Sequence, residues 1–314
     1  MRILFFVDFV NERWLYTLDF IFRNRGLKYH ITEDENSFLA SQAPKINLGK
    51  HPKEGAVNWQ HSGILDQEGL FKGEITDGIK GVHSLCFDDV FDPLSSIFFV
   101  LSRMEEYLID ERDHHNRFSP YSSYQHKYGW IEQCICDRWA TWLLREWNEI
   151  LGIEQDIKVQ KGEILPTFDI DNAFAYKLKE KTRKFMSIAK DISKFDRQRL
   201  TERRDVLNDK VKDPYDTYEL IKNVAKHFKV KVFWLVGEYA NYDRNISIEL
   251  EEHQDLIRSI SKTVEIGIHP SYRSNNATFH LWKEKESLEK ALGSGEKITS
   301  ARQHFLRLHL PETY

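Results

Sequence analysis

Cysteine is scarce in this 314-residue chain, which has only Cys86, Cys134 and Cys136. Three thiols cannot build a disulfide framework, because one of them would always be left over. The Cys-x-Cys spacing of the last two is too tight for a common zinc knuckle, and no second cysteine pair is present to complete four ligands. We therefore expect buried or half-buried free thiols and a reducing compartment.

Long apolar runs are also missing. Residues 3–7 are apolar, but Asp8 interrupts them. A secretory signal needs a longer apolar region followed by small residues, and a membrane span needs about 20 consecutive apolar residues. The sequence therefore predicts no membrane span and a cytoplasmic protein.

The chain has no excess of positive charge, because 45 Lys and Arg residues face 49 Asp and Glu residues, a formal net charge of −4. Its basic runs at 177–184 and 197–204 are interleaved with acids, which is typical of solvated helix faces. The glycines between residues 49 and 81 do not have the spacing of a phosphate-binding loop. We predict no nucleic acid partner.

The composition that remains is that of a globular protein, with 41% hydrophobic and 30% charged residues. The length is sufficient for two domains that each bury a core. A short polar connector at 153–161 is the best candidate for a linker. We therefore predict an N-terminal domain at 1–158 and a second domain at 159–314.

The first domain opens with a β-α-β order. Residues 3–9 have the pattern of a strand, residues 14–22 repeat apolar side chains at helical spacing, and residues 29–32 resemble a second strand. Apolar helices are predicted at 92–107, where Pro follows Asp at the helix start, and at 139–151. This order predicts an α/β layer.

A polar loop follows the first of these helices. It places His114 and His115 beside Asp110 and Asp113, which is one possible set of metal ligands. Adjacent histidines on a loop usually face different directions, so we favour a structural network of arginines and carboxylates here.

The second domain alternates strands with helices. Strand patterns occur at 164–170, 230–236, 263–268 and 298–305, and helical patterns at 218–228, 253–262 and 281–292. Alternation of this kind predicts a parallel, β/α-barrel-like sheet. In such folds the functional residues lie at the carboxyl ends of the strands.

Asp169 and Asp171 end the first of these strands. Residues i and i+2 of a strand point to the same face, so the two carboxylates should project together. Two close like charges need a cation or a shared proton to hold them there. The alternative is that Asp171 or Asn172 caps a following helix, and the stretch alone leaves both interpretations open.

Other strand ends carry compatible chemistry. His269 follows one predicted strand, and Arg302 and His304 lie at the end of the last one. Imidazole and carboxylate together suit zinc or another first-row divalent ion, and three protein ligands with an open position are typical of a catalytic site. A metal-bound water beside a carboxylate base is a hydrolase arrangement.

These segments resemble the motifs of a known family. Residues 167–171 (TFDID) resemble the first motif of the polysaccharide deacetylases, which are carbohydrate esterase family 4 and have the NodB-homology fold. Residues 265–271 (EIGIHPS) resemble the second motif, and residues 300–314 resemble the third, which contains Arg and Pro. Segments within 92–118 resemble an uncharacterised domain that precedes a divergent branch of the family.

The resemblance covers most of the chain and implies an activity. It implies a metal-dependent hydrolase that removes acetyl groups from N-acetylated sugars or polysaccharide, with a divalent metal, zinc by preference. Asp169 and Arg302 would be the catalytic residues, and Asp171 and His269 would bind the metal. The substrate would be an acetylated carbohydrate.

The sequence departs from the family pattern in three places. Ile170 separates two acids that are adjacent in the family, so the assignment of Asp169 as base and Asp171 as ligand is an inference. Arg273 stands where a second histidine is usual, and a guanidinium cannot bind a metal, so we assign His304 as the third ligand. The chain stops just after the third motif, so we expect a partial barrel, truncated at its C-terminus.

Two other functions compete with this one. A non-catalytic relative would keep the fold and bind a glycan or a protein, with Arg273 filling the vacant ligand position. A hydrolase of another amide or ester class is the second alternative, because a fold does not determine its substrate.

Overall fold

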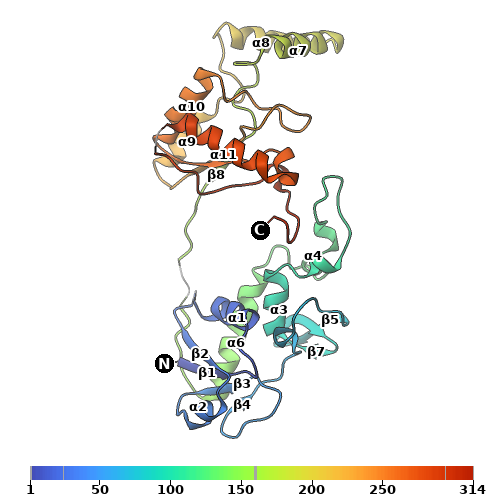
Figure 1. Ribbon diagram of the computed structural model, residues 1–314, viewed down its shortest axis with the longest axis vertical. Helices are drawn as coiled ribbons and strands as arrows, with labels where there is room; N and C mark the ends of the chain where they lie inside the picture. The colour runs from blue at the N-terminus through green and yellow to red at the C-terminus, as the bar shows by residue number, and fades with distance from the viewer. Residues whose placement is uncertain (1, 24, 159–160, 294, 314) are drawn as a thin grey trace. The chain divides into compact units, whose positions relative to one another are not determined.

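The computed structural model describes residues 2–23, 25–158, 161–293 and 295–313 and divides into two compact units (Figure 1). Unit 1 comprises Met1–Asp113 and Phe118–Gly162, and unit 2 comprises His114–Arg117 and Glu163–Tyr314. The main division therefore falls shortly after the predicted one at residue 158. No sequence pattern indicated that the four residues 114–117 belong to the second unit.

The first unit contains a parallel sheet with strand order β2-β1-β3-β4. The strands are β1 (Arg2–Phe6), β2 (Lys28–Thr32), β3 (Lys45–Asn47) and β4 (Val57–Asn58). Helix α1 (Glu12–Arg23) connects β1 to β2 and buries Trp14, Leu18 and Phe22. The predicted β-α-β opening is confirmed, and α2 (Glu35–Ala40) follows β2.

A second, antiparallel sheet follows in the same unit. It consists of β5 (Ile75–Lys80), β6 (Val82–Phe87) and β7 (Val90–Phe91). The remaining helices are α3 (Pro93–Leu101), α4 (Glu105–Leu108), α5 (Tyr124–Lys127) and α6 (Ile135–Leu151). The helix predicted at 92–107 is wrong as a single element, because Arg103 takes a left-handed backbone with φ of 56° and separates α3 from α4.

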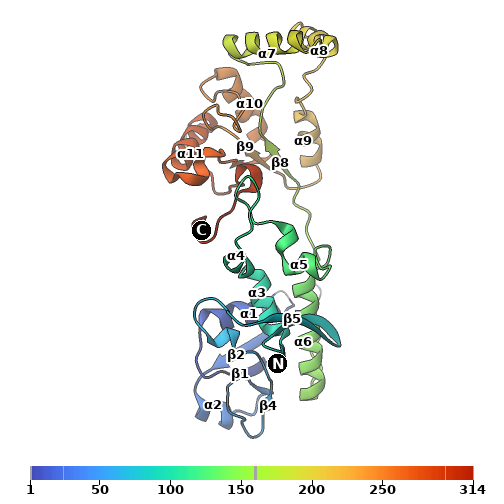
Figure 2. The ribbon, with the colours of Figure 1, turned by 90° about the vertical axis from the view of Figure 1, so that its right-hand side faces the viewer.

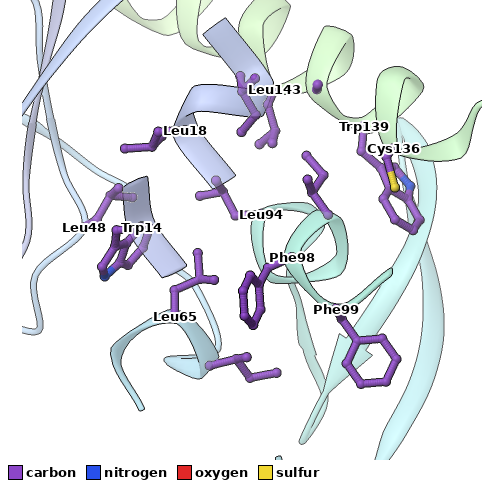
Figure 3. Packing of buried hydrophobic residues seen from close by; sticks show 14 of the residues in the cluster. Trp14, Leu18, Leu48, Leu65, Leu94, Phe98, Phe99, Cys136, Trp139 and Leu143 are labelled. Atoms are coloured by element: carbon purple, nitrogen blue, oxygen red, sulfur yellow. The ribbon is translucent and has the colours of Figure 1, made fainter. Parts of the chain in front are cut away.

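Large aromatic side chains fill the core of unit 1 (Figure 3). Trp139 on α6 and Phe99 on α3 are fully buried. The indole N–H of Trp139 donates to the carbonyl oxygen of His83 at 2.7 Å, so this buried polar group is satisfied. Trp139 and Trp147 of α6 are therefore core residues, as the spacing predicts, and Trp142 is partly buried against the same core.

The second unit is built on a parallel three-stranded sheet of order β10-β9-β8. The strands are β8 (Thr167–Ile170), β9 (Lys231–Trp234) and β10 (Glu265–Ile268). The helices are α7 (Lys181–Ser193), α8 (Arg197–Leu207), α9 (Tyr218–Ala225), α10 (Glu251–Ser261) and α11 (Thr278–Leu292). In Figure 2, α9, α10 and α11 lie beside the sheet, whereas α7 and α8 lie at one end of the unit. Parallel pairing aligns the carboxyl ends of all three strands at one edge.

Two strand predictions in this unit are wrong, one at its N-terminal limit and the other as a whole. The first strand begins at Thr167, because Ile164 and Leu165 are exposed instead of buried. The segment 298–305 is not a strand, since Ala301 makes only an isolated parallel bridge to Ile268. A short 3₁₀ turn follows that bridge.

The observed class is therefore mixed α/β, which confirms the general prediction. A closed barrel is not formed by the described strands of unit 2, and the barrel-like deacetylase fold stays a prediction. No helix in the described ranges is long and apolar enough to cross a membrane.

Candidate metal centre

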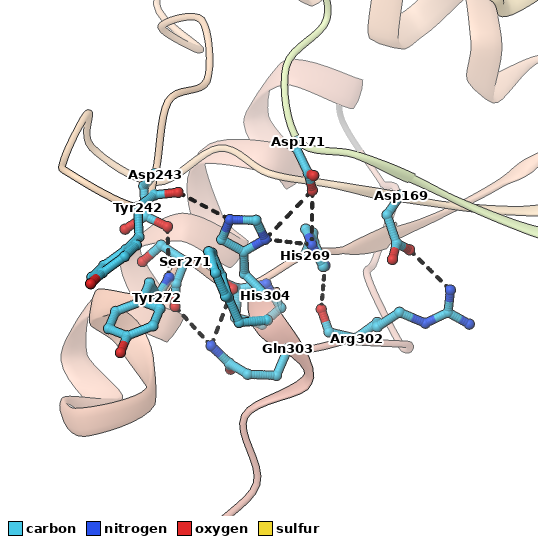
Figure 4. Close-up of polar contacts among 12 residues, drawn as sticks. Asp169, Asp171, Tyr242, Asp243, His269, Ser271, Tyr272, Arg302, Gln303 and His304 are labelled. Atoms are coloured by element: carbon cyan, nitrogen blue, oxygen red, sulfur yellow. Dashed lines mark hydrogen bonds and ion pairs between the residues drawn. The ribbon is translucent and has the colours of Figure 1, made fainter. Parts of the chain in front are cut away.

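Three predicted ligands come together at the carboxyl edge of the unit 2 sheet (Figure 4). Asp171 follows β8, His269 follows β10, and His304 opens the turn η4 (His304–Leu306). One ligand atom from each side chain lies within 4.8 Å of the others. Segments far apart in the sequence thus build one cluster, as predicted.

The distances within the cluster are short. His269 Nε2 lies 3.2 Å from Asp171 Oδ1, and His304 Nδ1 lies 3.5 Å from the same oxygen. The two nitrogens are 2.9 Å apart. Both imidazoles are buried, whereas the Asp171 side chain is 61% exposed. The cluster is therefore held from the protein side and accessible from the side of the carboxylate.

Backbone carbonyls determine which imidazole nitrogens carry protons. His269 Nδ1 lies 2.5 Å from the carbonyl oxygen of Arg302, and His304 Nε2 lies 3.1 Å from that of Tyr242. A carbonyl oxygen only accepts, so each of these nitrogens carries the proton in the neutral ring. The other nitrogens, His269 Nε2 and His304 Nδ1, then face each other with lone pairs.

Two lone pairs at 2.9 Å repel unless a cation lies between or beside them. A proton on one nitrogen satisfies this requirement, and so does a metal ion. The carbonyl contacts are those that a metal site requires, because metal-binding histidines almost always donate their second N–H to an oxygen acceptor. Two nitrogens and one carboxylate oxygen also match the ligand chemistry of zinc.

Asp171 is held in its ionised form. When a proton on His269 Nε2 takes the place of an ion, its hydrogen bond is the largest cause that lowers the pKa of Asp171; burial opposes the shift, and electrostatic interactions with His304 and His269 lower the pKa further. The carboxylate is therefore ready to act as an anionic ligand.

Asp169 and Arg302 form a separate pair beside the cluster. The Arg302 guanidinium lies 3.0 Å from Asp169 Oδ1 and donates to Thr167 Oγ1 at 2.9 Å. It also lies over the ring of Phe233, 4.6 Å from the centroid. The two acids that were expected to project together thus have different partners, Arg302 for Asp169 and the histidines for Asp171.

Arg273, at the position of the usual second histidine, lies outside the cluster. It begins the turn η3 (Arg273–Asn276), and its guanidinium pairs with Glu238 at 3.5 Å. Among the described residues, His304 is the histidine that joins His269 and Asp171.

The sequence did not indicate that residues 114–117 pack around the turn that carries His304. The ring of His115 lies 4.6 Å from that of Phe305 and 5.4 Å from that of Tyr242. Arg117 donates to the carbonyl oxygen of Phe305 at 2.8 Å. His115 is thus outside the metal cluster. It contacts Phe305, which is adjacent to His304 in the sequence, and Tyr242, whose carbonyl oxygen contacts His304.

Further contacts support the loop at the strand ends. Gln303 donates to the carbonyl oxygens of Pro270 and Ser271, at 3.2 and 2.8 Å. The buried Asp243 accepts the N–H of Tyr272 at 2.7 Å. These roles depend on backbone groups that come close only in the folded chain, so no side-chain pattern predicts them.

A polar cavity of about 300 Å³ lies beyond the end of β9. Its lining includes Gly237, Ser271 and Glu284, and Ser271 is two residues from His269. Glu284 is buried, and burial raises its pKa while hydrogen bonds from the amide and hydroxyl of Ser271 oppose the rise. The cavity therefore has a hydrogen-bonding residue, Ser271, close in sequence to the candidate metal ligand His269.

In the comparison with known proteins, a family model matches only part of the chain. Residues 3–151 match a family described as a family of unknown function (DUF7033). No curated protein and no solved structure matches the chain. Asp171, His269 and His304 all lie outside the matched residues, so the function of this chain has to be argued from the site itself.

Proposed function

We propose that this chain is a metal-dependent hydrolase that removes acetyl groups from N-acetylated sugars or polysaccharide. The observation that carries the proposal is the pair of buried imidazoles whose protonated nitrogens face carbonyl oxygens and whose other nitrogens face each other beside Asp171. A divalent ion, zinc by preference, fits this donor set.

The residues of the site have separate roles in this proposal. Asp171, His269 and His304 would hold the ion, which when bound would act as a Lewis acid and lower the pKa of a water. Asp169 accepts the proton of the attacking water as general base. Its position two residues before Asp171 places both roles on one strand end.

Arg302 links these two functions through different atoms. Its carbonyl oxygen accepts from His269 and so orients a ligand, whereas its guanidinium pairs with Asp169 and so orients the base. Contacts to Thr167 and Phe233 hold the guanidinium in place. Arg302 therefore fixes the position of the base Asp169 relative to the ligand His269.

The substrate class rests on the motif resemblance. The segments 167–171, 265–271 and 300–314 contain the residues that form the site, in the order of the deacetylase motifs, and a barrel-like deacetylase fold is part of the proposal. The polar cavity beside Ser271 suits a hydroxyl-rich ligand such as a sugar.

The test combines metal analysis with hydrolysis of acetylated oligosaccharides. We expect about one zinc ion per chain, a loss of bound zinc in His269→Ala, and retention in the exposed control His227→Ala. Asp169→Asn should keep the metal and lose roughly 10²- to 10⁴-fold in rate, the usual contribution of a general base. Full zinc content in His269→Ala would refute the ligand assignment.

A non-catalytic binding module is the alternative, and the engagement of Asp169 by Arg302 favours it. This alternative predicts zinc binding and glycan binding without hydrolysis, and an Asp169→Asn variant with unchanged glycan affinity. A hydrolase of another class would instead act on other amides or esters in a substrate panel.

A further inference from the structure

Helix α7 in unit 2 turns its polar side inward. Asp191 is buried and pairs with the buried Arg203 of α8, and Arg203 also donates to Ser187 Oγ at 2.6 Å. The Arg203 guanidinium lies over the ring of Tyr176, 4.9 Å from its centroid. Amphipathic helices in water normally bury their apolar side, so this arrangement is inverted.

The outward side of α7 is apolar. We call this surface the α7 stripe; its members are between 56% and 87% exposed and comprise Phe185, Met186 and Ile192 of α7 and Phe195 just beyond the end of the helix. Residues 185 and 192 are seven apart and therefore lie on one helix face, with the small Ala189 between them. Grouped exposure of large apolar side chains marks a binding surface more often than a solvated one.

The same segment is positively charged. Residues 181–197 contain six basic and two acidic side chains in a chain whose net charge is −4. Both acids have partners inside the hairpin, because Asp191 pairs with Arg203 and Asp196 accepts the N–H of Arg199 at 3.0 Å. The exposed basic residues around the stripe are Lys181, Lys190, Lys194 and Arg197.

We propose that the α7 stripe binds the surface of an anionic lipid bilayer, with α7 lying in the plane of the membrane. An apolar helix face bordered by lysines matches the boundary between acyl chains and anionic headgroups. The stripe runs along the outside of a helix and forms a ridge, and Figures 1 and 2 show α7 and α8 side by side at one end of unit 2. A ridge suits a bilayer better than it suits a helical peptide, which needs a groove.

The buried ion pair between Asp191 and Arg203 explains why α7 keeps its polar side inward. Breaking such a pair is costly, because one charge would remain buried and unpaired. Rotating α7 to hide its stripe would break the pair, so the hairpin holds the apolar side outward. The stripe is thus presented without any change in the fold.

Flotation with lipid vesicles tests the proposal on the full chain. We expect binding to vesicles of phosphatidylcholine mixed with phosphatidylglycerol, weak binding to phosphatidylcholine alone, and release by salt. Phe185→Ser with Ile192→Ser should weaken binding roughly tenfold or more, because two large apolar contacts are lost. Lys190→Glu with Lys194→Glu should weaken it roughly tenfold or more at low salt.

A matched control comes from helix α11. Phe279 is 73% exposed and Phe185 is 74% exposed, so Phe279→Ser removes an equally exposed ring outside the stripe. We expect this variant to bind vesicles as the natural chain does. Circular dichroism confirms that each variant is folded before its binding is compared. Equal loss in the Phe279→Ser variant would overturn the proposal.

A tryptophan introduced into the α7 stripe distinguishes a bilayer from another part of the chain or a second copy as the group that covers the stripe. In Phe185→Trp, the added emission should shift to the blue only when anionic vesicles are present. A blue-shifted emission without lipid would mean that another part of the chain or a second copy covers the stripe. Light scattering in which Phe185→Ser converts a dimer to a monomer would also overturn the proposal, as would equal binding to neutral and anionic vesicles.

Discussion

Unit 2 buries His253 in one region and the pair His269 and His304 in another, and the two environments differ in one decisive way. Behind the sheet, His253 accepts the indole N–H of Trp234 at 2.9 Å and faces the carbonyl oxygen of Ser247 at 3.0 Å. Every nitrogen of this ring has a complementary partner. At the strand ends, His269 and His304 each have one such partner and direct the other nitrogen at each other.

The comparison shows how a structural histidine differs from a candidate ligand. A structural histidine has a donor for its lone pair and an acceptor for its proton, so it needs no ion. The strand-end pair has two acceptors for its protons, one for each ring, and none of the described residues places a donor between the rings. Burial is common to both regions and therefore does not distinguish them.

The largest expected difference is in metal affinity. His304→Ala should weaken zinc binding by more than about 100-fold, because losing a ligand costs more than losing one of its supporting contacts. His253→Ala should leave zinc affinity unchanged. Chelator competition measures both, and equal losses in the two variants would abolish the distinction between the regions.

The reverse difference is expected in stability. His253→Ala leaves the buried N–H of Trp234 without its acceptor, which should lower the free energy of unfolding by about 1–3 kcal/mol. Urea unfolding of the metal-free protein measures it, with the exposed His227→Ala as the control. A stability equal to that of the natural chain would show that the Trp234 contact contributes little.

Arg302→Lys should have a smaller effect, confined to the catalytic step. Lysine keeps the backbone carbonyl that His269 contacts but cannot donate to Asp169 and Thr167 in the same planar geometry. We expect a rate lower by roughly 10- to 100-fold with unchanged zinc content, because the base is still present but is less well oriented. Loss of zinc in this variant would show that the side chain also positions the ligand.

The smallest expected effect is a pH dependence of stability. Burial lowers the pKa of His253 in the folded protein, while a hydrogen bond to the carbonyl of Ser247 opposes the shift. The unfolded chain then binds more protons below its own pKa of about 6.5, so stability falls as the pH decreases below that value. His253→Asn should flatten this slope, and an unchanged slope would assign it to other groups.

Much of the unit 2 site is encoded locally. Asp171 and His269 directly follow strands whose apolar patterns are visible in the sequence, and parallel pairing brings such strand ends together. His304 reaches the site differently. Its segment forms one bridge at Ala301 and then a turn in which Phe305 has a φ of 61°, so the predicted strand was wrong. His304 nevertheless lies in the cluster with the other two predicted ligands.

The features that sequence did not predict are those made by backbone groups or distant segments. The carbonyl oxygen of Tyr242 determines the protonated nitrogen of His304, yet any residue at position 242 would supply a carbonyl. The segment 114–117 joins unit 2 through contacts such as the one between His115 and Phe305, which exist only in the folded protein. Side-chain patterns carry no information on either contact.

X-ray absorption at the zinc edge of the zinc-loaded protein tests the central claim most directly. We predict two nitrogen ligands at about 2.0–2.1 Å and at least one carboxylate oxygen at about 2.0–2.2 Å. We also predict the loss of one nitrogen ligand in His304→Ala and no change in His253→Ala. A spectrum with sulfur ligands, or one that is the same in His304→Ala as in the natural chain, would contradict the account.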